Sequence, residues 1–315
     1  MKNNTLKFID LFAGIGGIRM PFSEQNCECV FTSEMDKYAQ KTYLSYYNDQ
    51  ASGDITLIND NDIPDFDILL AGFPCQPFSQ AGLKQGFSDT RGTLFFDIER
   101  ILKSKKPKCF LLENVKGLKG HDKGNTFKTI IKSLEDLGYY VKFQVLSAKD
   151  FNLPQNRQRI YIIGFLNKEQ FDNFYFPEPI KQTIFIKDIL EKEVDNKYTL
   201  SDKLWAGHQR RKEKHLLNGN GFGYKMYNQN SAYVGTISAR YYKDGSEILI
   251  EQSGKNPRML TPLEAARLQG FPDELVIKAK KAGLSDAQLY KQFGNSVAVS
   301  VIRAISNNIL KALKH

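Results

Sequence analysis

Residues 67–79, with the sequence DILLAGFPCQPFS, constrain the fold more than any other stretch of the chain. They begin with an apolar run at 68–71, which is typical of a strand buried on both faces of a parallel sheet. Two prolines then flank Cys75. Because proline fixes φ and lacks an N–H, they predict a stiff loop at the carboxyl end of that strand. Open α/β sheets bind their ligands at this end of the strands.

Cys75 is therefore a candidate nucleophile. A free cysteine is more often a small buried core residue. The flanking prolines and the polar side chains of Gln76 and Ser79 argue against a core position here. The other three cysteines of the chain show neither zinc-ligand nor disulfide spacing, so we expect no metal site and a reducing compartment, the cytoplasm.

Short apolar segments recur along the first half of the 315-residue chain. We expect strands at 7–12, 29–33, 68–71, 108–112, 139–147 and 159–165. With helical patterns at 36–46 and 93–103, these segments indicate an α/β fold. No run approaches the roughly 18 apolar residues of a membrane span, and the first twelve residues lead into a strand without the pattern of a signal peptide.

A glycine-rich turn, AGIGG at 13–17, follows the first strand. Glycines between a strand and a helix let a ligand approach the backbone. Glu34 ends the second strand, at the position where nucleotide-binding folds place an acid against the ribose. Arg19 stands where a dinucleotide fingerprint requires glycine, so these residues argue against a nicotinamide cofactor.

One carboxylate and two arginines are further candidates for the same site. Glu113 follows the strand at 108–112, on the same rim of the sheet as Cys75, although a lone acid at a strand end is usually just solvated. Arg157 and Arg159 lie two residues apart, so in an extended chain they share one face. That face could line a pocket or form an exposed strand edge.

Five blocks of the sequence, taken together, resemble the DNA (cytosine-5)-methyltransferases of the bacterial restriction-modification type. They are FAGIGG at 12–17, FPCQPFS at 73–79, ENV at 113–115, PQNRQR at 154–159 and GNSV at 294–297. The likeness covers nearly the whole chain, and the blocks stand in the family's order.

The resemblance implies an α/β, Rossmann-like methyltransferase domain that depends on S-adenosylmethionine and has a mostly seven-stranded sheet. It also implies a smaller, irregular, β-rich target-recognition domain. The catalytic and cofactor-binding domain would be discontinuous, comprising residues 1–180 and 288–315. Residues 181–287 would form the recognition domain and its hinge.

The implied reaction is transfer of a methyl group from S-adenosylmethionine to carbon 5 of a flipped-out cytosine in a short, specific site of double-stranded DNA. Cys75 would form a covalent adduct at carbon 6, Glu113 would act at N3, and Arg157 and Arg159 would line the base pocket. Such an enzyme is the modification half of a restriction-modification system. A cognate endonuclease could accompany it, but no stable protein partner is implied.

The resemblance also assigns the cofactor contacts. They are Phe12, Ala13, Gly14, Gly16, Gly17, Glu34, Met35, Asp54, Ile55, Pro74, Asn295, Ser296 and Val297. Close relatives often carry an aromatic residue in place of Met35, where the side chain packs against the adenine. Methionine can still pack there, so only cofactor affinity is affected.

A polyanionic partner suits the charge of the chain, which is +9 overall. Residues 181–262 carry 14 basic and 9 acidic side chains, so over half of the excess lies in about a quarter of the sequence. The candidate DNA-binding residues are Ser79, Arg91, Thr236, Arg240, Tyr242 and Lys243.

The stretch 218–250 resembles the recognition regions of enzymes that methylate the inner cytosine of CCGG, CCNGG or CCWGG sites. We expect Arg240 in a β-rich stretch, followed by a turn at 243–245 that brings Arg240 and Lys243 near DNA. A helix is expected at 204–216, where His208 and His215 read as solvated residues rather than metal ligands.

Two other functions share parts of this pattern. A tRNA cytosine-5 methyltransferase has the same catalytic blocks, but its typical Cys-Phe-Thr signature is absent from this sequence. A DNA-binding regulator without activity would not need Cys75, Glu113 and both arginines, all of which are intact.

Overall fold

The computed structural model describes residues 5–74, 94–221 and 223–314. Its main sheet has six strands in the order β2-β1-β3-β4-β6-β5. They are β1 Lys7–Leu11, β2 Glu28–Ser33, β3 Ile68–Gly72, β4 Cys109–Val115, β5 Tyr140–Ser147 and β6 Gln158–Phe165. The first four are parallel, and β6 runs antiparallel to both of its neighbours.

All six strands lie at the segments where apolar runs predicted them. The expectation of a seventh strand was wrong for the described part of the chain, whose main sheet has six. That strand depended on the resemblance alone, because the sequence pattern offers no seventh apolar run beside the other six.

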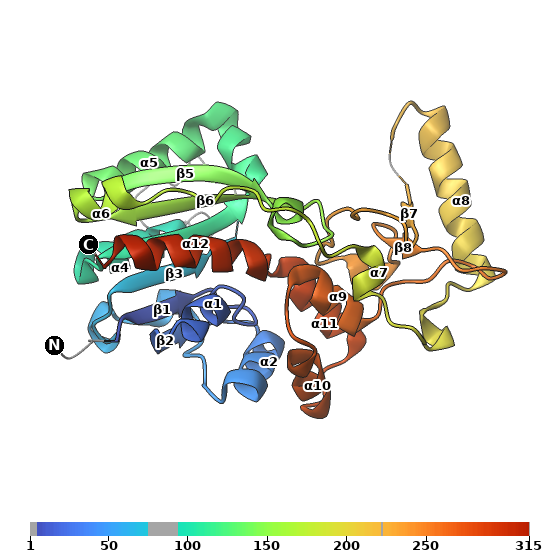
Figure 1. The fold of residues 1–315 in the computed structure, drawn as a ribbon, viewed down its shortest axis with the longest axis horizontal. Coiled ribbons are helices and arrows are strands. Elements are labelled where there is room, and N and C mark those ends of the chain that lie inside the picture. Colours follow the sequence, from blue (N-terminus) through green and yellow to red (C-terminus); the bar gives the residue numbers. More distant parts are fainter. Residues whose placement is uncertain (1–4, 75–93, 222, 315) are drawn as a thin grey trace.

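Helices cover both faces of the sheet (Figure 1). Strand side chains alternate between the faces: Phe8, Leu70 and Leu111 pack with α1 Arg19–Glu24 and α12 Val299–Ala312 in one core cluster. Alternate residues of the same strands pack on the other face with α4 Leu94–Lys105 and α5 Asn125–Asp136. The last helix of the chain thus packs on the sheet built by its first half.

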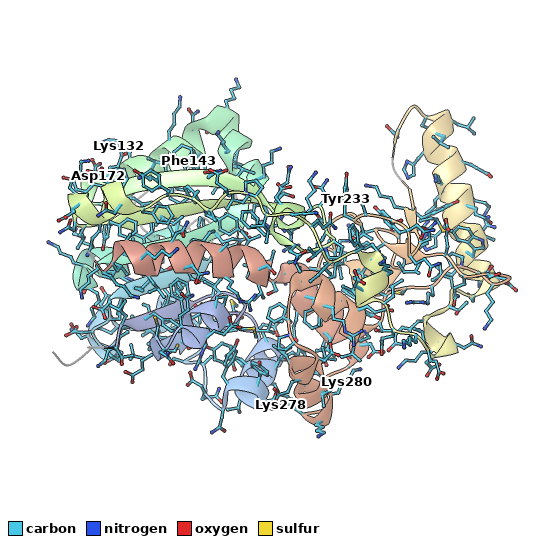
Figure 2. The ribbon with its side chains drawn as sticks, viewed as in Figure 1. Lys132, Phe143, Asp172, Tyr233, Lys278 and Lys280 are labelled. Atoms are coloured by element: carbon cyan, nitrogen blue, oxygen red, sulfur yellow. The ribbon has the colours of Figure 1, made fainter. Side chains whose placement is uncertain are left out.

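A third core cluster joins the sheet to the recognition region. It contains α9 Pro262–Gln269, α10 Asp273–Lys281 and α11 Asp286–Asn295, and it includes Ile15 of the glycine turn and Ala39 of α2 Lys37–Tyr47. In Figure 2, Lys278 and Lys280 on α10 lie at the lower edge of the molecule. The glycine turn and these helices therefore share one apolar core.

The recognition region is irregular, as expected, but it is not β-rich in its described residues. Its strands are the two-residue β7 Met226–Tyr227 and β8 Leu249–Ile250, and its longest element is α8 Asp202–Leu217 (Figure 1). The stretch around Arg240 is not a strand, because its backbone closes local turns: Tyr241 N donates to Ser238 O and Lys243 N to Arg240 O.

The connection between the sheet and this region passes α7 Ile186–Ile189 and α6 Lys168–Asn173. Near the junction, Lys149 Nζ lies 5.0 Å from the ring centre of Tyr233 (Figure 2). No helix among the described residues is long and apolar enough to cross a membrane.

Candidate functional site

A cavity of about 540 Å³ opens at the carboxyl ends of β1, β3 and β4. Its walls come from the glycine turn, the loop after β2, the ends of β3 and β4, the two arginines at the start of β6, and the end of α11 with the loop behind it. It therefore gathers four of the five sequence blocks, and Phe73 and Pro74 represent the fifth.

Glu113 lies beside the strand that leads to Cys75. It pairs with Gly72 across β3 and β4, and a Cβ placed on Gly72 would lie 3.7 Å from Glu113 Oε2. Next to it, Asn114 Nδ2 donates to Phe73 O at 2.9 Å, which ties the ends of the two strands together. Cys75 itself lies outside the described residues, as do Ser79 and Arg91.

Arg159 contacts the carboxylate of Glu113, with Nε 3.2 Å from Oε1. The two side chains are diagonal neighbours across β4 and β6, because Val115 is the residue paired with Arg159. Burial raises the pKa of Glu113, and the nearby charges of Arg159 and Arg157 oppose that rise. The carboxyl group therefore holds a proton at higher pH than an exposed glutamate does.

Arg157 makes different contacts from Arg159. Its side chain is 2% exposed, and its guanidinium donates to the carbonyls of Ile237 at 3.1 Å, Gly294 at 3.1 Å, and Ser296. Burial lowers the pKa of Arg157 to about 9, which leaves it charged at neutral pH. It lines the cavity, but its donors are directed at backbone carbonyls.

The glycine turn contains two glycines in a left-handed backbone conformation. Gly14 and Gly16 have φ of 56° and 77°, a region that favours glycine. Glu34 holds the turn: its Oε2 accepts from Gly14 N and its Oε1 from Asp36 N, each at 2.7 Å. A carboxylate offers about four lone-pair sites, so Glu34 can also accept from a ribose hydroxyl.

The two ends of the chain meet at this turn. A Cβ placed on Gly17 would lie 2.8 Å from Val297 Cγ2 and 2.9 Å from Ser296 Oγ. Met35 is 68% exposed at the cavity wall, where its side chain is free to cover a planar ring. The open space, the exposed thioether and the backbone that tolerates no side chain fit an adenosyl ligand.

Three expected cofactor residues, Gly16, Asp54 and Ile55, do not line the cavity. Gly16 instead lies against Tyr47, whose ring a Cβ on Gly16 would meet at 2.3 Å. Asp54 Oδ1 accepts from Thr56 N and Oγ1 at 3.0 and 2.9 Å, which caps a short 3₁₀ helix, and Ile55 is buried. Conversely, sequence reasoning missed Leu94, Gln288, Lys291 and Gln292, which do line it. The last three precede Asn295 on α11 at helical spacing, and that spacing was the available signal.

Three of the candidate DNA-binding residues flank one buried anchor, Tyr241. Its hydroxyl donates to Ile248 O and accepts from Leu260 N, both at 2.7 Å. Arg240, Tyr242 and Lys243 around it are exposed. Thr236 instead contacts the first half of the chain, where its hydroxyl donates to Asn156 O at 2.8 Å.

His208 was expected in solvent, and that expectation was wrong. The side chain is buried and its Nε2 lies 3.1 Å from Asp244 O. This face of α8 is directed inward, and the rings of Trp205 and His208 pack against the ring of Tyr224.

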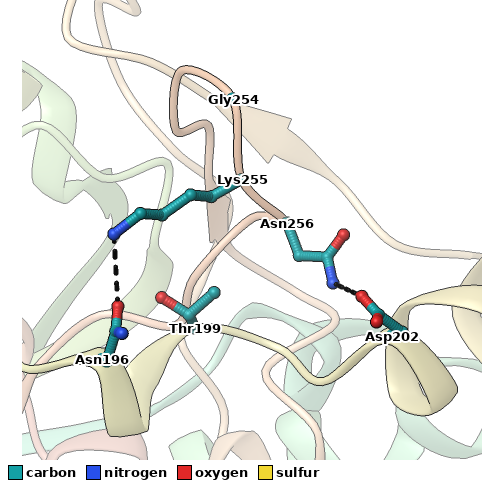
Figure 3. A pocket seen from close by; sticks show the side chains of 6 residues that line it. All are labelled: Asn196, Thr199, Asp202, Gly254, Lys255 and Asn256. Atoms are coloured by element: carbon teal, nitrogen blue, oxygen red, sulfur yellow. Dashed lines mark hydrogen bonds between the residues drawn. The ribbon is translucent and has the colours of Figure 1, made fainter.

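A second hollow, of about 600 Å³, lies in the recognition region between α8 and the loop at 254–256 (Figure 3). Its lining is polar, and Asn256 Nδ2 donates to Asp202 Oδ1 at 2.7 Å. Lys255 Nζ lies 3.4 Å from Asn196 Oδ1. Its described lining contains neither a cysteine nor a carboxylate paired with arginine, so the cavity at the strand ends is the better candidate for chemistry.

Comparison with known proteins agrees with this assignment. The family model of C-5 cytosine-specific DNA methylase matches residues 6–311. The chain is 61% identical to the type II methyltransferase M.SsoII of Shigella sonnei over 99% of its own length and 82% of the relative's. It is 62% identical to M.NlaX of Neisseria lactamica (98% and 97%) and 47% identical to M.HpaII of Haemophilus parainfluenzae (97% and 89%).

The fold is also that of solved methyltransferases. The structure of S. pombe Dnmt2 superposes with a TM-score of 0.81 at 22% identity, covering 98% of this chain and all of that one. The Entamoeba histolytica methyltransferase EhMeth gives 0.78 at 21% identity, covering 99% and 100%. At these identities the likeness concerns the fold alone, whereas the family match and the close relatives concern function. The chain belongs to the C-5 cytosine-specific DNA methylases, and it transfers a methyl group from S-adenosylmethionine to carbon 5 of cytosine in DNA.

Proposed function

We propose that Cys75 is the nucleophile of this reaction and Glu113 its acid, acting on a cytosine flipped out of a CC…GG duplex site. The observation that supports this most directly is the position of Glu113. Its carboxyl group is buried, holds its proton to higher pH, and lies beside Gly72, three residues before Cys75.

Carbon 5 of cytosine is a poor nucleophile, so the ring must first be activated. The Cys75 thiolate adds to carbon 6, and the π pair of the C5=C6 double bond shifts to the C4–C5 bond. The π pair of the C4=N3 bond shifts to N3, which takes a proton from Glu113. Carbon 5 becomes the nucleophilic end of an enamine. Carbon 5 would then take the methyl group that bound S-adenosylmethionine supplies. A base removes the carbon-5 proton, the C6–S bond breaks, the thiolate leaves with its electron pair, and N3 returns its proton to Glu113.

The two arginines hold this arrangement. Arg159 keeps the Glu113 carboxyl in position through the 3.2 Å contact and still has guanidinium donors for the base carbonyl. Nearby positive charge also lowers the pKa of a thiol, which favours the thiolate of Cys75. S-adenosylmethionine, when bound, supplies an electrophilic methyl group. Phe12, the glycine turn, Glu34, Met35 and residues 295–297 would hold it in the cavity.

Carbon 6 is stacked inside duplex DNA, so the target cytosine has to leave the helix, at a cost of roughly a few kcal/mol. A site between a catalytic domain, residues 1–180 and 288–315, and a recognition domain, residues 181–287, suits that movement. The shared apolar core of α9, α10 and α11 would serve as the hinge.

The target site is proposed from the recognition region. Exposed Arg240 and Lys243 beside the buried anchor Tyr241 are placed to reach DNA, and arginine meets the two major-groove acceptors of guanine with two donors. As the modification half of a restriction-modification system, the chain would protect the host from a cognate endonuclease. DNA from a host that expresses it should resist cleavage at the methylated site.

Covalent trapping tests the nucleophile. Duplex DNA with 5-fluorocytosine at the target should form a stable adduct with the wild type, because fluorine replaces the proton that must leave. Cys75→Ser should bind the same duplex without trapping, while the control Cys29→Ser should trap normally. An adduct mapped to any residue other than Cys75 would refute the mechanism. Methyl transfer to tRNA and none to duplex DNA would favour the tRNA enzyme instead.

A further inference from the structure

The backbone of Gly294 touches the backbone of the recognition region. A Cβ placed on Gly294 would lie 2.2 Å from the carbonyl carbon of Ser238 and 2.3 Å from the amide nitrogen of Ala239. These atoms cannot rotate away as the end of a side chain can. Gly294 is followed directly by residues 295–297, which line the cofactor cavity.

Arg157 fastens the same two segments together. Its guanidinium donates at 3.1 Å to Ile237 O on one side and at 3.1 Å to Gly294 O on the other, and it also donates to Ser296 O. The acceptors lie 80, 137 and 139 residues away along the chain. Arg157 Nε is buried without a partner, so these bonds from Nη1 and Nη2 are the ones that satisfy the buried guanidinium. Neither segment can move from Arg157 without leaving a further donor unpaired.

Two buried glutamines also form hydrogen bonds to these two segments. Gln155 Oε1 accepts from Ile237 N at 3.1 Å, and Gln155 Nε2 donates to Leu268 O at 3.0 Å. Gln269 Nε2 in turn donates to Phe293 O at 2.7 Å. Both glutamine side chains are buried, so the segments 237–239 and 293–296 are held as one unit.

We infer that Arg157 and Gly294 are positioning residues that couple the recognition segment, residues 237–240, to the cofactor turn, residues 294–297. Ordering of the cofactor turn by a bound ligand then orders the backbone that presents Arg240. The inference rests on the proposed role of that segment in reading DNA. Because such coupling is reciprocal, cofactor and cognate DNA should each raise the affinity for the other by the same factor.

The test is a set of binding measurements with S-adenosylhomocysteine, which cannot donate a methyl group. The dissociation constant of a cognate duplex is measured with and without saturating S-adenosylhomocysteine, beside a duplex with one altered base pair in the site. We expect the wild type to bind cognate DNA at least about 5-fold more tightly with the ligand, the lower end of typical coupling. The altered duplex should change less.

Gly294→Ala and Arg157→Lys should each reduce that factor to below about 2-fold, under the lower end of typical coupling. Alanine forces the two backbones apart, and lysine cannot reach three carbonyls with a planar fork. Gly120→Ala is the matched control, because nothing lies within 4 Å of its added Cβ. A double variant that loses no more coupling than either single variant would support one shared link.

Hydrogen exchange of the wild-type protein tests the same coupling without a variant, so the result does not depend on whether a variant folds. Adding S-adenosylhomocysteine should slow the exchange of the amides at 237–241. Unchanged exchange there, or a wild-type coupling factor near one, overturns the inference, and so does full coupling in either folded variant. Failure of the wild type to methylate a CC…GG duplex would instead count against the proposed function.

Discussion

Arg258 and Glu264 form a two-pronged ion pair in the interior of the protein, with Nη1 2.7 Å from Oε2 and Nη2 2.8 Å from Oε1. The side chains are 7% and 0% exposed. Glu264 also accepts from Thr261 N and Glu191 N, so one carboxylate joins the start of α9 to the segment after α7. The pair therefore links segments within the recognition region, residues 181–287.

Arg258→Met should therefore destabilise the fold strongly. It leaves the Glu264 carboxylate buried without its charge partner, and breaking one side of such a pair typically costs about 3–5 kcal/mol. Lys132→Met is the control, because its pair with Asp136 is exposed and worth at most about 1 kcal/mol. Urea unfolding of both variants measures the difference. Equal, small losses would show that the buried pair contributes no more than a surface one.

Glu113→Gln should lower the single-turnover methylation rate by on the order of 10²–10⁴-fold while DNA and cofactor still bind, because an amide cannot give N3 a proton. The raised pKa of Glu113 adds a pH dependence: the acid is lost as pH rises through that value. Glu135→Gln, on the exposed side of α5, is the control. A rate within about 3-fold of wild type, under about 1 kcal/mol of barrier, would disprove the role.

The strands and the carboxylate site could be predicted because local patterns encode them. Apolar runs give the six strands, and Glu113 follows one of them directly. The contacts of Arg157 could not, since its partners lie at least 80 residues away. The sequence predicted only that Arg157 and Arg159 share one face. It did not predict that Arg159 would pair with Glu113 while Arg157 donates to backbone carbonyls.

The recognition region resisted prediction for a physical reason. Around Arg240, Ile237, Ala239 and Tyr241 alternate with polar Ser238 and Arg240, a pattern typical of a strand. The backbone is nevertheless held by turns and by Tyr241 instead of a ladder. α8 was predicted as a polar helix, but a polar helix can still bury a histidine when a backbone carbonyl, here Asp244 O, meets the ring. That carbonyl comes from a distant loop, which no local pattern reveals.

Asp10 should make stability fall as pH rises. Both carboxylate oxygens are buried without a hydrogen-bond partner. Burial raises the pKa of Asp10 to about 7, with Glu34 adding to the rise and Arg19 opposing it. The folded state thus binds a proton that the unfolded state has already lost above about pH 4, so ionised Asp10 disfavours folding.

Asp10→Asn removes that effect. Its stability advantage over wild type should grow by roughly 2–3 kcal/mol between about pH 5 and pH 8, as the linkage of a shift of this size requires. Urea unfolding at both pH values measures it, and Asp62→Asn at an exposed position serves as control. A gap that stays constant with pH would mean that Asp10 does not titrate in this range.

Binding to duplex DNA should depend strongly on salt, with α8 contributing. Lys203, Arg210 and Lys214 follow one face of this helix, and the glycine between them, Gly207, leaves a hollow of about 580 Å³. That face is turned away from buried His208. Charges at this spacing suit phosphates, which specify position and not sequence.

Replacing the three α8 cations by glutamine should reduce the slope of log K against log salt by about 0.9 for each phosphate that the variant no longer neutralises. The matched control replaces Lys132, Lys278 and Lys280, which lie on α5 and α10 (Figure 2). Fluorescence anisotropy over a salt series measures both triple variants. Equal slopes for the two would show that α8 acts only through the overall charge.

Arg240→Ala should relax sequence specificity. Arg240 is exposed and follows the segment that Arg157 holds in place, so its guanidinium can extend toward the major groove. If it reads a guanine, its loss should cost about 1–3 kcal/mol at cognate DNA and much less elsewhere.

Bisulfite sequencing of plasmid DNA from an expressing host first locates the methylated site, which we expect to be the second cytosine of CC…GG. Binding to that site and to a single-base variant is then compared, with Lys243→Ala as the neighbouring cation control. Equal weakening at both duplexes by Arg240→Ala would make Arg240 a phosphate contact, and methylation outside CC…GG would overturn the proposed site while leaving the enzyme class intact.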